Sequence, residues 1–193
     1  RREFDALGLQ AEWVDGTPFD RAGHLVARHV GTGGGPHLLL IGHLDTVFEP
    51  DSPFQSFERE GDRATGPGVV DMKGGNVVIL HALQALADAG VLAEMTITVV
   101  VTGDEERSGR PLDAARAALV EAAEAADIAL AFENGDSNPA TAVVSRRGST
   151  GWRLEVQGTP AHSSQLFQPS VGAGAIYEAA RILNGFYEAL AGE

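Results

Sequence analysis

The sequence predicts an α/β fold, in which a mainly parallel sheet flanked by helices is followed by the start of a smaller α+β domain. Apolar segments typical of buried strands alternate with segments of helical periodicity, which favours a parallel sheet covered on both faces. Hydrophobic residues make up 44% of the 193 residues, which is enough for a real core. Near Gly148 the pattern changes to that of a sheet with one exposed face.

The first third of the chain is expected to contain a helix end, two strands and a long loop. We expect residues 1–11 to form the end of a helix, because their apolar side chains fall on one helical face. Residues 23–30 and 36–42 are apolar and are predicted to be strands. Residues 50–68 are rich in Pro, Gly and charge, which indicates a long loop or an irregular hairpin. Loops of that length inside a compact domain are often functional.

Helices and strands then alternate. Residues 74–89 show helical spacing of apolar side chains, and Gly90 is a natural end for that helix. Residues 95–101 are apolar and β-branched, so they are predicted to form a buried strand. An alanine-rich helix is expected over 111–126, with a proline in its first turn, and a short strand over 127–132.

The last quarter of the chain is predicted to belong to a second domain. Residues 150–157 alternate between apolar and polar side chains, as in an antiparallel strand with one wet face. A helix is expected at about 170–191. The boundary is placed at 147–150, which gives a catalytic, metal-binding domain over 1–148 and the start of a lid or dimerisation domain over 149–193.

The acidic net charge argues against nucleic acid as a partner and is compatible with the binding of metal cations. The formal net charge of −13 disfavours a nucleic-acid surface, which requires a basic face against the phosphates. It is compatible with cation binding, although most of the 27 acidic residues are expected to serve only solubility. No stretch is long and apolar enough to span a membrane. We therefore expect a soluble protein that binds neither nucleic acid nor a membrane.

The absence of cysteine limits the kind of metal site. Without cysteine there are no disulfides and no thiolate ligands, so histidine and carboxylates must hold any metal. That ligand set is usual for a catalytic zinc. The compartment stays open between the cytoplasm and the periplasm or exterior. No signal peptide is visible, and Arg1 falls inside a predicted helix, so we expect the true N-terminus to be missing.

Groups able to bind a cation follow three predicted strands. His43 and Asp45 come after the second strand, Asp104–Glu106 after the third, and Glu133 after the fourth. Asp71 lies where the long loop turns into a helix. Ligands of open α/β sheets bind beyond the carboxyl ends of the strands, so these groups are expected to share one edge.

Each of these residues also has an ordinary structural interpretation. His43 alone fits a hydrogen-bonded loop histidine, and Asp71 fits a helix N-cap. Asp45 fits a residue that caps a turn, and Asp104–Glu106 fits a solvated acidic loop. Glu133 fits a surface residue before a turn. These interpretations do not explain why all of the residues fall at strand ends on one edge, so a metal site is the stronger hypothesis.

Five sequence runs resemble one known family. In chain order they are GHLDTV (42–47), GPGVVDMKGG (66–75), TGDEERSG (102–109), AFENG (131–135) and GTPAHSS (158–164). Together they resemble the zinc-dependent exopeptidase and deacylase family that includes glutamate carboxypeptidase, acetylornithine deacetylase and succinyl-diaminopimelate desuccinylase. The glutamate carboxypeptidase (carboxypeptidase G type) branch is the most similar. The resemblance extends from about residue 23 to the end of the chain.

The resemblance implies two metal ions and identifies protein ligands for both. His43 and Glu133 correspond to ligands of the first metal, Asp71 to the carboxylate that bridges both, and Glu106 to a ligand of the second. Asp45 corresponds to a residue that orients His43. The implied metal is Zn²⁺, two ions per complete chain, with Co²⁺ or Mn²⁺ as substitutes.

The resemblance also implies a general base and a residue from the lid. Glu105 corresponds to the base that takes a proton from the attacking water and delivers it to the leaving nitrogen. His162 corresponds to a lid histidine that stabilises the oxyanion, often across a dimer interface. A homodimer formed through the lid is therefore expected. The ordinary interpretation of His162 is a loop histidine after a proline.

The chain departs from the family pattern at its end. The family has a further histidine ligand for the second metal, but no histidine follows His162. The chain therefore looks like the N-terminal half of a longer protein, and alone it is expected to bind metal weakly or to be inactive. The intact protein is expected to be a carboxypeptidase that releases a C-terminal amino acid from a small peptide.

Three alternatives to this function remain open. The first is an N-acyl amino acid deacylase of the same family, and the second is a non-catalytic metal-binding or dimerisation homologue. Glu105 favours an enzyme, because a binding module has no need of a base beside a metal ligand. The third is a two-metal aminopeptidase without a lid. The change near Gly148 and the run GTPAHSS favour the lidded type.

Overall fold

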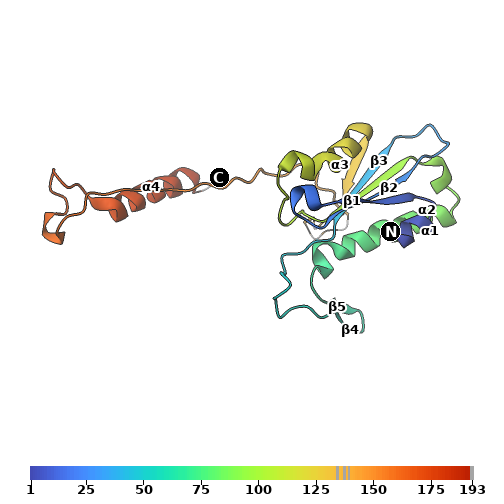
Figure 1. Cartoon of the computed structure of the whole chain (residues 1–193), viewed down its shortest axis with the longest axis horizontal. Helices are drawn as coiled ribbons and strands as arrows, with labels where there is room; N and C mark the ends of the chain where they lie inside the picture. The colour runs from blue at the N-terminus through green and yellow to red at the C-terminus, as the bar shows by residue number, and fades with distance from the viewer. Residues whose placement is uncertain (134, 137, 139, 192–193) are drawn as a thin grey trace. The chain divides into compact units, whose positions relative to one another are not determined.

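The computed structural model describes residues 1–133, 135–136, 138 and 140–191 (Figure 1). Contacts divide the chain into two compact units, Arg1–Val143 and Val144–Glu193. The interpretation of these units as a catalytic domain and the start of a lid domain stays a prediction.

The first unit is built on a five-stranded sheet in the order β1-β2-β6-β3-β7. Its strands are β1 (Gln10–Asp15), β2 (Gly23–His29), β3 (Leu38–His43), β6 (Ile97–Thr102) and β7 (Ile128–Ala131). β3 pairs with both β6 and β7 in parallel, whereas β1 and β2 pair antiparallel with each other and β2 pairs antiparallel with β6. The α/β class is confirmed, and the parallel strands are those that precede the predicted site residues.

Helices cover both faces of this sheet, as Figure 1 shows. They are α1 (Arg2–Ala6), α2 (Gly74–Asp88) and α3 (Leu112–Ala125), with short 3-10 turns at Thr17–Phe19 and Leu92–Glu94. The predicted helices over 74–89 and 111–126 are therefore confirmed to within a residue. α2 packs on one face and α3 on the other.

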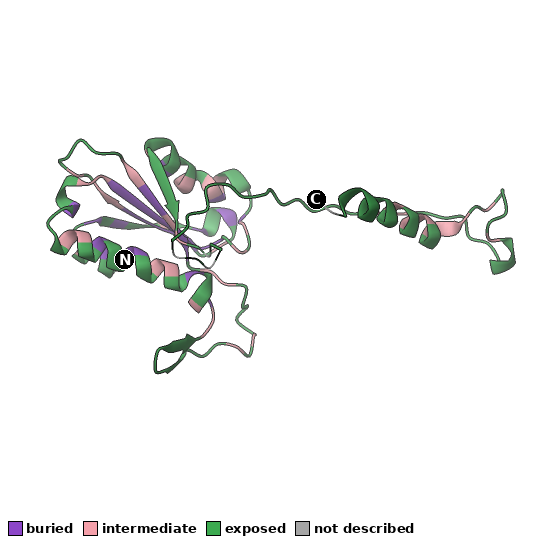
Figure 2. Cartoon of the chain, turned by 180° about the vertical axis from the view of Figure 1, so that it is seen from behind, coloured by how far each residue is buried: buried purple, intermediate pink, exposed green. Residues whose placement is uncertain are grey.

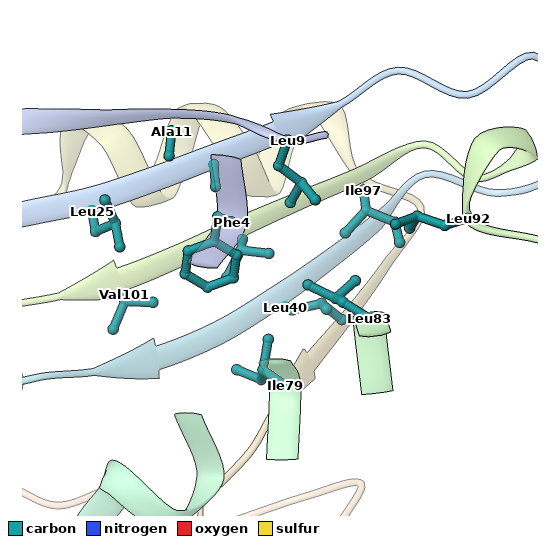
Figure 3. Close-up of a cluster of buried hydrophobic side chains, with 12 residues drawn as sticks. Phe4, Leu9, Ala11, Leu25, Leu40, Ile79, Leu83, Leu92, Ile97 and Val101 are labelled. Atoms are coloured by element: carbon teal, nitrogen blue, oxygen red, sulfur yellow. The ribbon is translucent and has the colours of Figure 1, made fainter. Parts of the chain in front are cut away.

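Alternation along the strands separates two hydrophobic clusters. The larger contains buried side chains of α1, α2 and four strands (Figure 3). On β6, Val99 and Val101 point into this cluster, whereas Val100 points into the smaller cluster beneath α3. Every residue of β6 is buried, because strands covered on both faces have no solvent side. This packing makes β6 and its neighbour β3 a rigid support for the residues at their ends.

The predicted helix over residues 1–11 is wrong in its second half. α1 ends at Ala6, and Gly8 adopts a left-handed conformation with φ of +84°. Glycine adopts such a φ without the steric cost that other residues meet, so it breaks the helix here. The chain then enters β1 at Gln10, where Ala11 is buried in the same cluster as Phe4. A helix followed by a strand therefore buries the same apolar side chains that the sequence pattern placed on one helical face.

The long segment over 50–68 contains a small hairpin, as one of the two sequence interpretations expected. β4 (Glu58–Glu60) and β5 (Arg63–Thr65) pair antiparallel around Gly61, which has φ of +59°. All six strand residues are exposed, and the hairpin projects away from the main sheet in Figures 1 and 2. A short π-helical turn over Val69–Lys73 then leads directly into α2. This turn places Asp71 at the start of the helix.

The second unit contains one long helix, α4 (Gly174–Leu190), and a 3-10 turn at Ser163–Gln165. The helix predicted at about 170–191 is confirmed, but the strand predicted over 150–157 is wrong. A strand requires a neighbour for its backbone N–H and C=O groups, and the described residues of this unit form no other strand. No described residue of the unit is buried (Figure 2). Every described helix of the chain is too short or too polar to cross a membrane.

Candidate metal centre

His43 lies at the centre of the site. It is the last residue of β3, and its side chain is 1% exposed. Its Nε2 atom lies 3.0 Å from Oδ1 of Asp71 and 3.2 Å from Oε1 of Glu133. Three predicted metal ligands therefore meet at one ring nitrogen. In the chain, Asp71 comes 28 positions after His43, and Glu133 comes 62 positions after Asp71.

Two further carboxylates complete the cluster. Atoms of His43, Glu105 and Glu133 that are able to ligate a metal lie within 4.8 Å of one another. The same limit holds for His43, Asp71 and Glu106. The structure thus brings together all four predicted metal ligands and the predicted base. The role of each residue stays a prediction.

Sheet topology explains the convergence. β3 and β6 run parallel and in register, with His43 opposite Thr102, so both strands end at the same edge. Leu44 N donates to Thr102 O at 2.8 Å just beyond this pair. β7 runs parallel on the other side of β3 and leads to Glu133. Carboxyl ends of parallel strands form the usual ligand site of α/β sheets.

Asp45 contacts both halves of the site. His43 Nδ1 lies 3.0 Å from the main-chain oxygen of Asp45 and 3.4 Å from its carboxylate. The carboxylate accepts hydrogen bonds from the backbone N–H groups of Glu105, at 3.1 Å, and Glu106, at 2.9 Å. The sequence predicts that Asp45 orients His43. In the structure its carboxylate also holds the segment of main chain that bears the two glutamates.

A second carboxylate, that of Asp104, holds the same loop after β6 that bears Glu105 and Glu106. Asp104 is fully buried and accepts hydrogen bonds from Gly109 N, at 2.9 Å, and from the guanidinium of Arg116. Arg116 also donates to the hydroxyl of Ser108 at 2.8 Å. These contacts tie Asp104 to Gly109 and Arg116, and Arg116 to Ser108, so they hold the loop that follows β6. Asp104 therefore has a structural part, distinct from that of Glu105 and Glu106.

The site is acidic enough to change the ionisation of its members. Burial raises the pKa of Glu105, and the charge of Glu133 raises it further. Burial and then the charge of Asp71 raise the pKa of Glu106. Burial lowers the pKa of His43, but hydrogen bonds to Asp71 and the Asp45 carbonyl outweigh it and leave that pKa above its ordinary value. Without a cation, the cluster therefore favours uptake of protons.

These contacts fit a divalent metal ion. A carbonyl only accepts hydrogen bonds, so Nδ1 of His43 bears the proton in the neutral ring and Nε2 presents its lone pair. In this neutral tautomer the lone pair faces the carboxylates of Asp71 and Glu133, so a cation bound there would replace the proton that the imidazolium otherwise donates to Asp71. One imidazole nitrogen and several carboxylate oxygens form the donor set of a catalytic zinc or a similar ion.

Comparison with known proteins identifies the family. Residues 39–185, more than half of the chain, match peptidase family M20/M25/M40. The chain belongs to this family. All five runs that suggested the resemblance lie inside the matched region, so that prediction is confirmed.

Curated relatives of this M20/M25/M40 chain act in more than one way, as their names show. Carboxypeptidase G2 of a Pseudomonas species is 35% identical over 151 residues, which are 78% of this chain and 35% of the relative. Succinyl-diaminopimelate desuccinylase of Granulibacter bethesdensis is 32% identical over 171 residues, which are 82% of this chain and 42% of the relative. The chain thus spans less than half the length of either relative.

Solved structures share the fold of the M20/M25/M40 chain. Human carnosine dipeptidase 1 aligns with a TM-score of 0.54 at 18% identity, over 69% of this chain and 31% of that one. An M20 family metallo-carboxypeptidase from Sulfolobus solfataricus aligns with a TM-score of 0.54 at 21% identity, over the same shares. At these identities the likeness concerns the fold alone.

One residue of the M20/M25/M40 site escaped sequence analysis. Asn76, in the first turn of α2, donates from Nδ2 to the main-chain oxygen of His43 at 2.6 Å. Its Oδ1 is buried without a hydrogen-bond partner among the described residues and lies 2.2 Å from where a Cβ on residue 42 would stand, so a side chain there would displace the amide. Gly75 similarly lets the chain at Phe132 approach the helix. The available signal was the Gly-Gly-Asn sequence that opens α2, three positions after Asp71.

His162 belongs to the second unit, whereas the residues of the cluster belong to the first. Its side chain is exposed and caps the 3-10 turn at Ser163–Gln165, with Nδ1 accepting from Ser164 N at 3.2 Å. The Ser164 hydroxyl lies 2.9 Å from the same nitrogen. These local contacts leave Nε2 without a partner among the hydrogen bonds of the described residues. The predicted role of His162 at the oxyanion stays a prediction.

Proposed function

We propose that the intact protein is a two-metal hydrolase, with zinc as its natural metal, that cleaves a peptide or amide bond. The convergence of His43, Asp71, Glu105, Glu106 and Glu133 at one sheet edge supports this proposal most directly. Membership of a peptidase family and similarity to amide-cleaving relatives support it as well. His43, Asp71 and Glu133 would hold the first metal, and Asp71 and Glu106 would contribute to the second.

The residues of the chain supply base catalysis and orientation. When bound, the divalent ions would polarise the substrate carbonyl and favour ionisation of the attacking water. Glu105, exposed at the edge of the cluster, takes the proton of that water and passes it to the leaving nitrogen. Asp45 keeps the backbone of Glu105 in place throughout.

The substrate class that we favour is a small peptide with a free C-terminal amino acid. The 35% identity to carboxypeptidase G2 supports carboxypeptidase activity. The 32% identity to a desuccinylase supports a second candidate, hydrolysis of an N-acyl amino acid. In both cases we assign His162 to the oxyanion and the second unit to a lid through which two copies pair.

A comparison of substrates tests the proposal. The intact, zinc-loaded protein is assayed against small peptides with a free C-terminal amino acid and against N-acetyl and N-succinyl amino acids. The Glu105→Gln variant is the inactive control. The proposal expects zinc-dependent release of free amino acid that the variant lacks. Preference for peptides supports the carboxypeptidase, and preference for acyl groups supports the deacylase. Failure to cleave any substrate with zinc bound would contradict both.

A further inference from the structure

A cavity lies beside the metal centre and is not accounted for by the ligands. Its volume is about 390 Å³, and Asp71 and Glu106 form one end of it. One wall comes from the loop after β3, with Val47, Phe48 and Phe54. The other comes from the end of β5 and the turn before α2, over residues 64–66 and 68–70.

Specific contacts hold the two walls together. Gly68 has φ of +70°, and a Cβ there would stand 2.5 Å from the methyl group of Thr46. The walls therefore meet at a glycine that no other residue replaces without strain. Lys73 donates to the Pro67 carbonyl at 2.7 Å, which fixes the second wall. The hollow is thus a built feature of the fold.

Two aromatic rings stiffen the first wall. Phe48 and Phe54 pack edge to face, with centroids 4.9 Å apart. Aromatic pairs prefer this arrangement, which fixes both rings in the wall.

The lining selects for an apolar group. Asp71 and Glu106 are the charged residues among those described in the lining, which include no Lys, Arg or His. No side chain of the lining would therefore neutralise a carboxylate of the substrate. Val47 is 66% exposed and Val70 is 68% exposed, which is unfavourable for aliphatic side chains unless something covers them. An uncharged apolar group would cover them, and the volume is within the range of ligand sites.

We propose that this cavity is a substrate subsite that binds an uncharged aliphatic or aromatic group next to the scissile amide. The inference rests on the proposed function, because the cavity is continuous with the metal centre through Asp71 and Glu106. It adds a substrate class: one flank of the scissile bond bears an apolar group.

Paired substrates test the subsite in the intact, zinc-loaded protein. We compare kcat/KM for N-hexanoyl and N-acetyl amino acids, and for dipeptides with phenylalanine or alanine on either side of the bond. The apolar member of at least one pair is expected to be favoured about tenfold or more. Phe48→Ala and Val47→Asp should reduce this preference severalfold. Phe57→Ala, on the same loop but outside the cavity and 66% exposed, is the matched control and should retain it.

A binding measurement separates failure of the subsite from failure of the proposed reaction. Octanohydroxamate and acetohydroxamate are titrated calorimetrically into the zinc-loaded protein and its variants. Tighter binding of the longer probe, abolished by Val47→Asp, supports the subsite even if no substrate is cleaved. Equal binding of both probes overturns it even if hydrolysis occurs. Unchanged selectivity in both Phe48→Ala and Val47→Asp would also overturn it, because the cavity lining would then not contact the substrate.

Discussion

At the scale of single residues, Asp45 connects the two halves of the site. Its main-chain oxygen fixes the ring of His43, while its carboxylate accepts from two successive N–H groups that bear Glu105 and Glu106. Metal ligands usually need such supporting partners, because an unsupported side chain samples many rotamers. The family resemblance assigns Asp45 to the histidine alone. Its hydrogen bonds to the glutamate loop are a finding of the structure.

Asp45→Asn should therefore lower turnover more than metal content. The amide oxygen still accepts one N–H, but the amide nitrogen faces the other N–H, so one hydrogen bond becomes a repulsion. We expect kcat to fall about 10- to 100-fold. Steady-state kinetics and elemental analysis of the intact protein measure both effects. Asp15→Asn is the matched control, since Asp15 only caps Thr17 at an exposed turn and should change neither.

Glu105 and Glu106 should differ when each is changed to glutamine. Glu105→Gln is expected to abolish most turnover, by about 10²- to 10⁴-fold, with metal content preserved, because the proton acceptor is lost. Glu106→Gln should instead weaken binding of the second metal. Kinetics and metal analysis of both purified variants test this division. Parallel loss of metal and activity in both variants would contradict it.

At the scale of elements, the first turn of α2 acts as the platform of the site. It begins three positions after Asp71, holds the main chain of His43 through Asn76, and contacts the chain before Glu133 through Gly75. β7 pairs with β3 only as far as Ile41, so the carbonyl of His43 lies beyond that ladder and takes its hydrogen bond from Asn76. Three proposed metal ligands, His43, Asp71 and Glu133, thus lie around one helix end.

Asn76→Ala should weaken metal binding while leaving the fold nearly as stable. The change removes a hydrogen bond to His43, but it also removes a buried oxygen that has no partner, and these effects oppose each other. We expect the dissociation constant for zinc to rise about tenfold. Competition with a chelating dye measures it, and thermal unfolding of the metal-free protein reports the fold. Gln84→Ala, on the exposed face of the same helix, should leave zinc affinity unchanged. Equal affinity in both variants would remove Asn76 from the site.

The elements also show what sequence patterns can and cannot predict. The sequence predicts β3, β6, α2 and α3 correctly, because the spacing of their apolar residues matches the side chains that are buried in the structure. The site was readable because its ionisable residues follow those strands. The apolar pattern over residues 1–11 does not show that Gly8 ends the helix. The strand expected over 150–157 lacks a partner strand among the described residues, and a local sequence pattern does not reveal whether a partner is present. Asn76 acts on a main-chain atom, so it matches no ligand motif.

At the scale of the whole molecule, the proposed activity requires both units. The cluster lies in Arg1–Val143, whereas His162 lies in Val144–Glu193, on a unit whose described residues are all at least partly exposed. Exposed apolar side chains of α4, among them Ile176 and Tyr187, indicate a surface that further protein covers. We propose that this unit pairs two copies of the intact protein.

Mixed dimers test whether His162 acts across that pairing. His162→Ala should lower kcat by about 10²- to 10³-fold without loss of metal, because one oxyanion donor is removed. If the histidine acts in the partner's site, mixing this variant with Glu105→Ala should recover part of the activity. One site of each mixed dimer then has both groups intact. Mixed dimers without recovery would exclude action in trans, and a fully active His162→Ala protein would exclude any role at the oxyanion.

Metal content of the intact protein is the most direct measurement of the central claim, that the edge of β3, β6 and β7 holds a two-metal hydrolytic centre. Elemental analysis should give two divalent ions per chain, predominantly zinc, in the wild type. Exhaustive chelation should abolish amide hydrolysis, and added zinc should restore it. Glu133→Ala should retain fewer ions than the wild type, because it removes a carboxylate proposed to hold the first metal together with His43. A protein that contains no metal and remains fully active would contradict the claim.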